Sequence, residues 1–304
     1  MIEIIPSGTN IDFLRLRKPA IAISLVVIGI GLASLILKGG PNYGIDFAGG
    51  LQLHMRANPD VSIGDVRDAV ADLGVGEVQV QAFESQKGEY LLRVAGAEEQ
   101  DLTGGVAAKL KESLRERFSA RGYEELRTEL VGPRVGKDLR RRAILAVTFS
   151  TLAMGVYIAL RFDRRFGIGA AIALFHDVLV TLGALSLWDI EVDLTIIAAL
   201  LTIVGYSVND TVVISDRIRE NLMGSKRPEL GPVINRSINE TLSRTILTTG
   251  ATMLVVISLF LVGGTVIHGF AFALIVGFVS GVYSTVFIAA PLVEWLEPGR
   301  SVAT

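Results

Sequence analysis

Six long apolar runs divide this chain, and they dominate its hydrophobic pattern. A helix rises about 1.5 Å per residue, so a bilayer core about 30 Å thick needs about 20 apolar residues. An open chain can satisfy its backbone hydrogen bonds inside that core only as a helix. We therefore expect a polytopic α-helical membrane protein, with six transmembrane helices over residues 19–37, 143–160, 166–188, 194–215, 245–267 and 269–293.

The connections between these runs differ in charge, and this difference predicts how the chain lies in the membrane. Lys and Arg gather before the first run, in the 161–165 loop and after the fourth run, whereas the 189–193 loop is acidic. Short loops rich in Lys and Arg stay in the cytoplasm. We therefore expect both termini to be cytoplasmic, with cytoplasmic segments 1–18, 216–244 and 294–304, and a periplasmic segment 38–142.

Two features allow another interpretation of the first spans. Arg140, Arg141 and Arg142 lie on the outer side of the second run, against the charge rule, although long translocated domains follow that rule weakly. The run 19–37 also has the position of a cleaved signal peptide, but it has the length of a full span and lacks a clear small-residue cleavage site. We expect it to remain as a helix.

The periplasmic segment alternates between strand and helix patterns. Alternate apolar positions are typical of half-buried strands, and Ser62 with Asp65 forms a capping box that opens an amphipathic helix. The predicted order is β-α-β-β-α-β, which is the ferredoxin-like α+β arrangement. Its predicted elements are strand 51–55, helix 62–73, strand 77–83, turn 85–88, strand 89–94, helix 98–120 and strand 127–131.

Composition narrows the function further. Half of the 304 residues are apolar, yet half of the charged side chains lie between residues 38 and 138, so the chain is not a single soluble globule. A net charge of −2 gives no sign of nucleic-acid binding, and the absence of cysteine excludes disulfides and Cys-ligated metals. No phosphate-binding glycine motif is present. We expect no metal, no cofactor and no enzymatic activity.

The fourth apolar run carries one carboxylate. An ionisable residue inside a span is costly, so Asp210 is a candidate functional residue. Its natural partner is Arg244, which directly precedes the antiparallel fifth run and lies at a similar depth. An equally open interpretation makes Arg244 an interfacial anchor, and Asp210 part of a solvated helix end or of a structural ion pair.

Other polar residues lie near this pair in the predicted bundle. Their side chains can relay protons, and they can equally be satisfied by hydrogen bonds between helices. A small-residue stripe at Ala273, Gly277 and Gly281 predicts close helix packing instead of chemistry. The candidate supporting residues are His176, Asp177, Tyr206, Ser207, Asn209 and Thr248.

Several motifs, in order along almost the whole chain, resemble the SecF branch of the SecD/SecF family, within the resistance-nodulation-division superfamily. Ala48 and Ser215 depart from the residues expected in that family, and neither position touches the candidate pair. The motifs are Gly44–Gly50, Val131–Pro133, His176-Asp177, Gly205–Thr211, Asp216–Glu220 and Asn239–Thr245.

The resemblance implies a role in protein export across the bacterial plasma membrane. It implies a SecD partner in a heterodimer, and assistance to the SecYEG channel after the SecA ATPase has pushed the preprotein from inside. Protons of the transmembrane gradient would supply the energy, with Asp210 and Arg244 conducting them. The glycine-rich segment would join the first span to the periplasmic domain, with candidate hinge residues Gly44, Asp46, Gly49 and Gly50, although it also fits a plain turn.

Three other functions remain open from the sequence. A small-molecule proton antiporter of the same superfamily would usually need a longer chain with two such halves. A structural scaffold would tolerate Asp210→Asn. A membrane-embedded enzyme would need a catalytic constellation, and none is convincing in this sequence.

Overall fold

A computed structural model of the chain shows two compact units. The structure describes residues 9–71, 73, 78–83, 87–94, 105–223 and 229–296. The two compact units are called the helical unit and the sheet unit. The helical unit comprises Met1–Asn42, Leu145–Ile190 and Thr195–Thr304, and the sheet unit comprises Tyr43–Ile144 and Glu191–Leu194.

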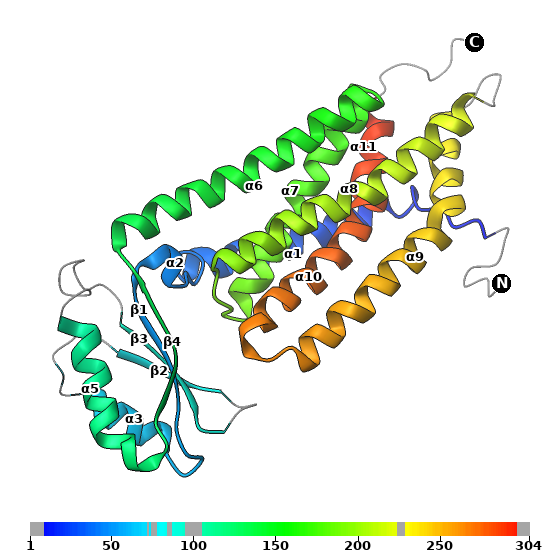
Figure 1. The fold of residues 1–304 in the computed structure, drawn as a ribbon. Helices are drawn as coiled ribbons and strands as arrows, with labels where there is room; N and C mark the ends of the chain where they lie inside the picture. Colours follow the sequence, from blue (N-terminus) through cyan, green and yellow to red (C-terminus); the bar gives the residue numbers. More distant parts are fainter. Residues whose placement is uncertain are drawn as a thin grey trace. The chain divides into compact units, whose positions relative to one another are not determined.

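Six helical segments are long and apolar enough to cross a membrane, in agreement with the six predicted spans (Figure 1). The last of them is α10 (Thr265–Ser284), which continues through a π-helical turn (Thr285–Ala289) into α11 (Ala290–Trp295). The other five are α1 (Arg17–Leu37), α6 (Pro133–Arg161), α7 (Arg164–Leu187), α8 (Leu194–Met223) and α9 (Leu230–Val262).

The helices extend beyond the predicted spans. α6 begins at Pro133 and not at residue 143, so Arg140–Arg142 are helical. Most of 216–244 is also helical, because α8 ends at Met223 and α9 begins at Leu230. The turn before α10 lies at Gly263 and Gly264, so this helix begins at Thr265 and not at residue 269. Hydropathy marks only the apolar part of a helix, whereas Arg, Lys and Glu also favour helix and carry it past the apolar run.

Small residues let the helices of the bundle approach closely. A Cβ added at Gly31 of α1 would lie 2.7 Å from the Cα of Gly183 on α7. A Cβ added at Gly281 of α10 would lie 3.1 Å from the Cβ of Ser207 on α8, and one at Gly277 would overlap Ile203. The close packing predicted for the stripe on α10 is confirmed.

Gly31→Val should separate α1 from α7, because the added side chain has no room against the Gly183 backbone. We expect it to destabilise the bundle by about 1–3 kcal/mol. The measurement is the melting temperature of the purified chain in detergent. Gly29→Val is a matched control on the same helix, since a Cβ there meets nothing within 4 Å. Equal melting temperatures for the two variants would contradict the packing argument.

The sheet unit has the predicted β-α-β-β-α-β order, and its strands pair antiparallel in the order β2-β3-β1-β4. α5 is observed from Ala107, and the part of the predicted helix at 98–104 lies outside the described residues. Residues 85–86, the first half of the predicted turn, also lie outside the described residues. The elements are β1 (Gly50–Arg56), α3 (Ile63–Val70), β2 (Val78–Ala82), β3 (Glu89–Val94), α5 (Ala107–Phe118) and β4 (Glu124–Val131).

The core of this unit lies between one sheet face and its two helices. Leu51, Leu53 and Met55 alternate on β1 and are fully buried, and Leu114 and Phe118 of α5 pack against the same core. Burying such a side chain is worth about 1.5–3 kcal/mol. The period-two pattern of the sequence therefore marks the face that the helices cover.

The capping box at the start of α3 is confirmed. The backbone N–H of Asp65 donates to Ser62 Oγ at 3.1 Å, and the N–H of Ser62 donates to the Asp65 carboxylate at 2.9 Å. The hydrogen bond from the Ser62 N–H to the carboxylate stabilises the charged form and lowers the pKa of Asp65. Two residues three apart are enough to set this helix end, which is why it was predictable from sequence.

Candidate functional site

A carboxylate lies fully buried at the centre of the helical unit. Both oxygens of Asp177 on α7 have partners. Oδ1 accepts from the Ser280 hydroxyl at 2.7 Å and lies 3.1 Å from His176 Nδ1. Oδ2 accepts from Ser207 at 2.8 Å and from Ser284 at 2.9 Å. Such complete hydrogen bonding is what a buried carboxylate needs.

The hydrogen bonds continue from His176 to α1. Its Nε2 lies 3.2 Å from Ser24 Oγ, which in turn lies 3.3 Å from the Tyr283 hydroxyl. The imidazole also stacks on the Tyr283 ring, with centroids 6.1 Å apart. We call this set the Asp177 network, and it joins four helices. Its members are Ser24, His176, Asp177, Ser207, Ser280 and Ser284.

Asp210 on α8 has a different environment. Its side chain is nearly buried, with a 4% exposed fraction, yet within the described part of the chain no hydrogen bond or ion pair reaches its carboxylate. The charge of Arg244 on α9 acts on it through space. The predicted partners therefore interact through their charges, but within the described residues they do not form a direct ion pair.

The residues predicted to support Asp210 are divided among other contacts. Ser207 shares its helix face but bonds Asp177. The Tyr206 hydroxyl lies 3.3 Å from Thr249 and Thr252 on α9, and its ring stacks on Phe278 at 4.2 Å. Among the residues that the structure describes, Asp210 therefore keeps no neighbouring side chain as a fixed partner, although hydrogen bonds of Tyr206 hold α8 and α9 together beside it.

Polar residues also lie on exposed surfaces of α8 and α9. Asn209 is exposed on α8, and Arg244 and Thr248 are exposed on α9, where Thr248 donates to the Arg244 carbonyl at 2.9 Å. Only 11% of the apolar 18-residue stretch of α9 is buried within the chain, against 56% of the corresponding stretch of α7. Polar groups at membrane depth rarely face lipid. This surface therefore fits contact with another protein or with water.

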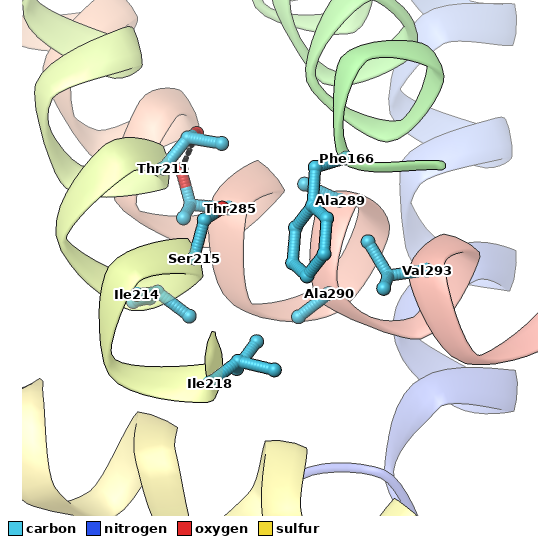
Figure 2. A pocket seen from close by; sticks show the side chains of 9 residues that line it. All are labelled: Phe166, Thr211, Ile214, Ser215, Ile218, Thr285, Ala289, Ala290 and Val293. Carbon is cyan, nitrogen blue, oxygen red and sulfur yellow. Dashed lines mark hydrogen bonds between the residues drawn. The ribbon is translucent and has the colours of Figure 1, made fainter. Parts of the chain in front are cut away.

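A small cavity lies against α8 and is lined by Thr211 and Ser215 of that helix (Figure 2). Thr211 directly follows Asp210 in the sequence. Its volume of about 10 Å³ is close to the minimum for one water molecule. Its wall is mostly apolar, with Thr211, Ser215 and Thr285 as the polar lining residues, and the Thr211 and Thr285 hydroxyl oxygens lie 3.2 Å apart. Polar groups thus continue along α8 past the unbonded carboxylate.

The glycine-rich segment after α1 is closely packed within the sheet unit. It forms the short helix α2 (Ile45–Ala48), and the Gly44 N–H donates to the Val192 carbonyl at 2.9 Å. The Asp46 carboxylate accepts from the N–H of Leu194, the first residue of α8, at 3.0 Å. The backbone of Gly49 has φ +76°, and a Cβ there would lie 2.8 Å from Pro133 Cα.

These contacts explain why glycine occupies this segment. Gly49 needs both the left-handed backbone region and the space of a missing side chain, and Gly50 likewise has positive φ. A hinge at Gly44, Asp46, Gly49 and Gly50 stays a prediction, since the contacts fix one conformation.

Sequence reasoning missed the hydroxyl groups of the Asp177 network outside α7 and α8. Ser24 lies on α1, and Ser280 and Ser284 lie on α10. The available signal was the spacing of Ser280 and Ser284, one helical turn apart on a strongly apolar helix, which is typical of hydrogen bonding between membrane helices. Across the described residues, no group of three or more His, Asp or Glu side chains could hold a metal ion.

Comparison with known proteins gives consistent matches. Residues 109–298 match the family model for "Protein export membrane protein SecD/SecF, C-terminal". The protein translocase subunit SecF of Magnetococcus marinus is 43% identical over 99% of this chain and 97% of its own length. The SecF subunit of Rhodothermus marinus is 44% identical over 94% of this chain and 93% of its own length.

Two solved structures share the fold. The crystal structure of SecDF from Thermus, described as a translocon-associated membrane protein, is 33% identical with a TM-score of 0.82 over 95% of this chain. SecDF in a super-membrane-facing form is 34% identical with a TM-score of 0.69 over 96% of this chain. This chain spans only 39% of either SecDF chain.

Proposed function

The chain belongs to the SecD/SecF family of protein export membrane proteins, and we propose that it acts as the SecF subunit of a SecD–SecF pair in the bacterial plasma membrane. Sequence identity of 43% and 44% to two SecF subunits, over nearly the full length of this chain, supports this role. In this proposal the chain is a transporter subunit and not an enzyme, and it needs no cofactor beyond protons.

Asp210 supplies the proton chemistry of the proposal. A carboxylate that lacks a fixed hydrogen-bond partner inside a span can take up and release a proton without breaking a network. This single observation carries the mechanism. Arg244 stabilises the ionised form through its charge, and protonation removes that attraction, so the two protonation states favour different packings of α8 and α9.

SecD is the proposed partner at the exposed polar surface of α8 and α9. Asn209, Arg244 and Thr248 would be costly against lipid, so a second helical half that covers them removes that cost. The similar SecDF chains contain a further region beyond the 39% that matches this chain, and we propose that SecD supplies its counterpart.

We expect the chain to have further partners in protein export. We expect the SecD–SecF pair to act with the SecYEG channel, after SecA has driven the preprotein from the cytoplasmic side. The sheet unit would hold and release the emerging preprotein as the bundle changes packing. Proton motive force then supplies the energy for this late step of translocation.

Export in a bacterium that lacks its own SecF tests this function. The full chain, produced together with SecD from the same source, should restore export of a secreted reporter and co-purify with SecD. An otherwise identical cell that produces SecD alone is the control. Co-purification without restored export would contradict an export role, and restored export without SecD would contradict the proposed heterodimer.

The proposed orientation places the sheet unit in the periplasm and the α8–α9 connection in the cytoplasm. The chain has no cysteine, so single cysteines report orientation directly. In intact cells, a membrane-impermeant maleimide should label Lys87→Cys in the sheet unit and should leave Glu220→Cys on α8 unlabelled until the membrane is broken. Labelling of the second variant in intact cells would contradict the orientation. Both positions are exposed.

A further inference from the structure

A large cavity lies at the surface of the helical unit, away from Asp210, and it is open on one side, since Leu25 and Trp295 of its wall are exposed. Its volume is about 700 Å³, within the range of about 300–1,000 Å³ that ligand pockets show. Ile21 and Leu25 of α1, Leu179 of α7 and Leu292 of α11 line it, and most of its wall is apolar. A cavity of this size and chemistry suits a hydrocarbon chain better than a polar solute.

One end of the cavity is basic. Arg17 and Lys18, at the start of α1, line that end together with Trp295, the last residue of α11. Arg17 pairs with Glu294, which fixes the two helix ends side by side. This pair neutralises Arg17, whereas no ion pair is found for Lys18 among the described residues, so the rim keeps a net positive charge.

The arrangement of these residues matches the depth profile of a membrane. Lys18 and Trp295 lie at helix ends, where basic and aromatic side chains meet lipid headgroups. The apolar residues continue from there along α1 and α7 toward the middle of the span. A phosphate at the rim and acyl chains along the wall would therefore meet matching chemistry over the whole length of the cavity.

The polar wall residues lie at the inner part of the cavity. Ser24 and His176 line it and are also bonded to each other at 3.2 Å in the Asp177 network. Their ring nitrogen and hydroxyl are thus already paired and do not require a polar ligand. The only unsatisfied charge that faces the cavity among the described residues is at the rim.

We propose that this cavity binds one anionic phospholipid, with its phosphate at Lys18 and its acyl chains between α1, α7 and α11. The commitment to an anionic lipid rests on charge complementarity at the rim and on the apolar wall behind it. The site does not depend on the proton role of Asp210, and its occupant would lie against His176 and stabilise the bundle at the edge of the Asp177 network.

Native mass spectrometry of the full chain in detergent tests the site. Phosphatidylglycerol should remain bound at one molecule per chain and should bind more tightly than phosphatidylcholine with identical acyl chains. Lys18→Gln should weaken phosphatidylglycerol binding about fivefold, as expected for one basic side chain beside an anionic headgroup. Arg15→Gln is the matched control, since Arg15 is a nearby basic residue outside the cavity wall.

A second pair of variants tests the apolar part. Leu179→Trp fills the cavity and should reduce retention of phosphatidylglycerol, whereas Leu187→Trp, on the same helix outside the wall, should not. A melting curve for each variant checks that it folds. Equal binding of the two lipids, binding unaffected by Lys18→Gln and Leu179→Trp, or displacement by inorganic phosphate alone would each overturn the proposal. Loss of the bound phosphatidylglycerol when SecD is present in the complex would overturn the proposal as well.

Discussion

Asp210→Asn should abolish the part of export that depends on proton motive force and reduce it to the level of cells that lack the chain. The amide cannot take up a proton at physiological pH, so the two packings of α8 and α9 lose the switch between them. Because the Asp210 carboxylate has no hydrogen-bond or ion-pair partner in the described part of the chain, an isosteric amide breaks no network. Folding and assembly with SecD should therefore persist.

The measurement is export of a reporter preprotein into membrane vesicles, with and without a proton gradient. Arg244→Met should give the same loss, because the charge that acts on Asp210 is removed. Asp138→Asn is the control, since Asp138 is exposed and pairs with Arg142 one turn away, a contact worth about 0.3–0.5 kcal/mol. Gradient-dependent export that persists in both Asp210→Asn and Arg244→Met would leave a structural role for this pair.

Asp177→Ala should have the largest effect on stability. The change removes the acceptor of three buried hydroxyls and the partner of His176 in one step. Each buried donor left without a partner costs about 1–3 kcal/mol, and partial rebonding to backbone carbonyls recovers some of this. We expect a loss of about 3 kcal/mol and a clear fall in melting temperature in detergent.

Matched variants distinguish the contribution of the whole Asp177 network to stability from that of one of its hydrogen bonds. Ser280→Ala removes one hydrogen bond, and single bonds between membrane helices average about 0.6 kcal/mol, so its effect should be much smaller. Asp177→Asn keeps one acceptor oxygen and replaces the other with an NH2 donor, so its effect should fall between the two. If Asp177→Ala melted like Ser280→Ala, the carboxylate would not organise the four helices.

The parts of this fold that local sequence determines were predictable. A capping box needs only Ser62 and Asp65, and the apolar alternation of β1 marks its buried face within five residues. Hydropathy likewise marked six spans and the charged residue Asp210 inside one of them. It could not set the helix ends, because the Arg-rich start of α6 and the charged end of α8 are helical without being apolar.

The site was only partly predictable, because its contacts join residues far apart in the chain. Asp177 bonds Ser280 and Ser284 more than 100 positions later, and His176 meets Ser24 on α1. A serine in an apolar helix carries a weak signal until the facing helix is known. Helical spacing also assigned Ser207 to Asp210, whereas packing against α7 turns its hydroxyl to Asp177.

The most direct test of the account measures the protonation of Asp210 itself. Infrared difference spectra of the SecD–SecF pair in lipid, recorded across a pH change, report protonated carboxyl groups by their carbonyl stretch. The account predicts a carboxyl band that changes with pH in the unmodified complex and in Asp138→Asn, and that is missing in Asp210→Asn. A band that remains unchanged in Asp210→Asn would contradict the claim that this residue takes up and releases the proton.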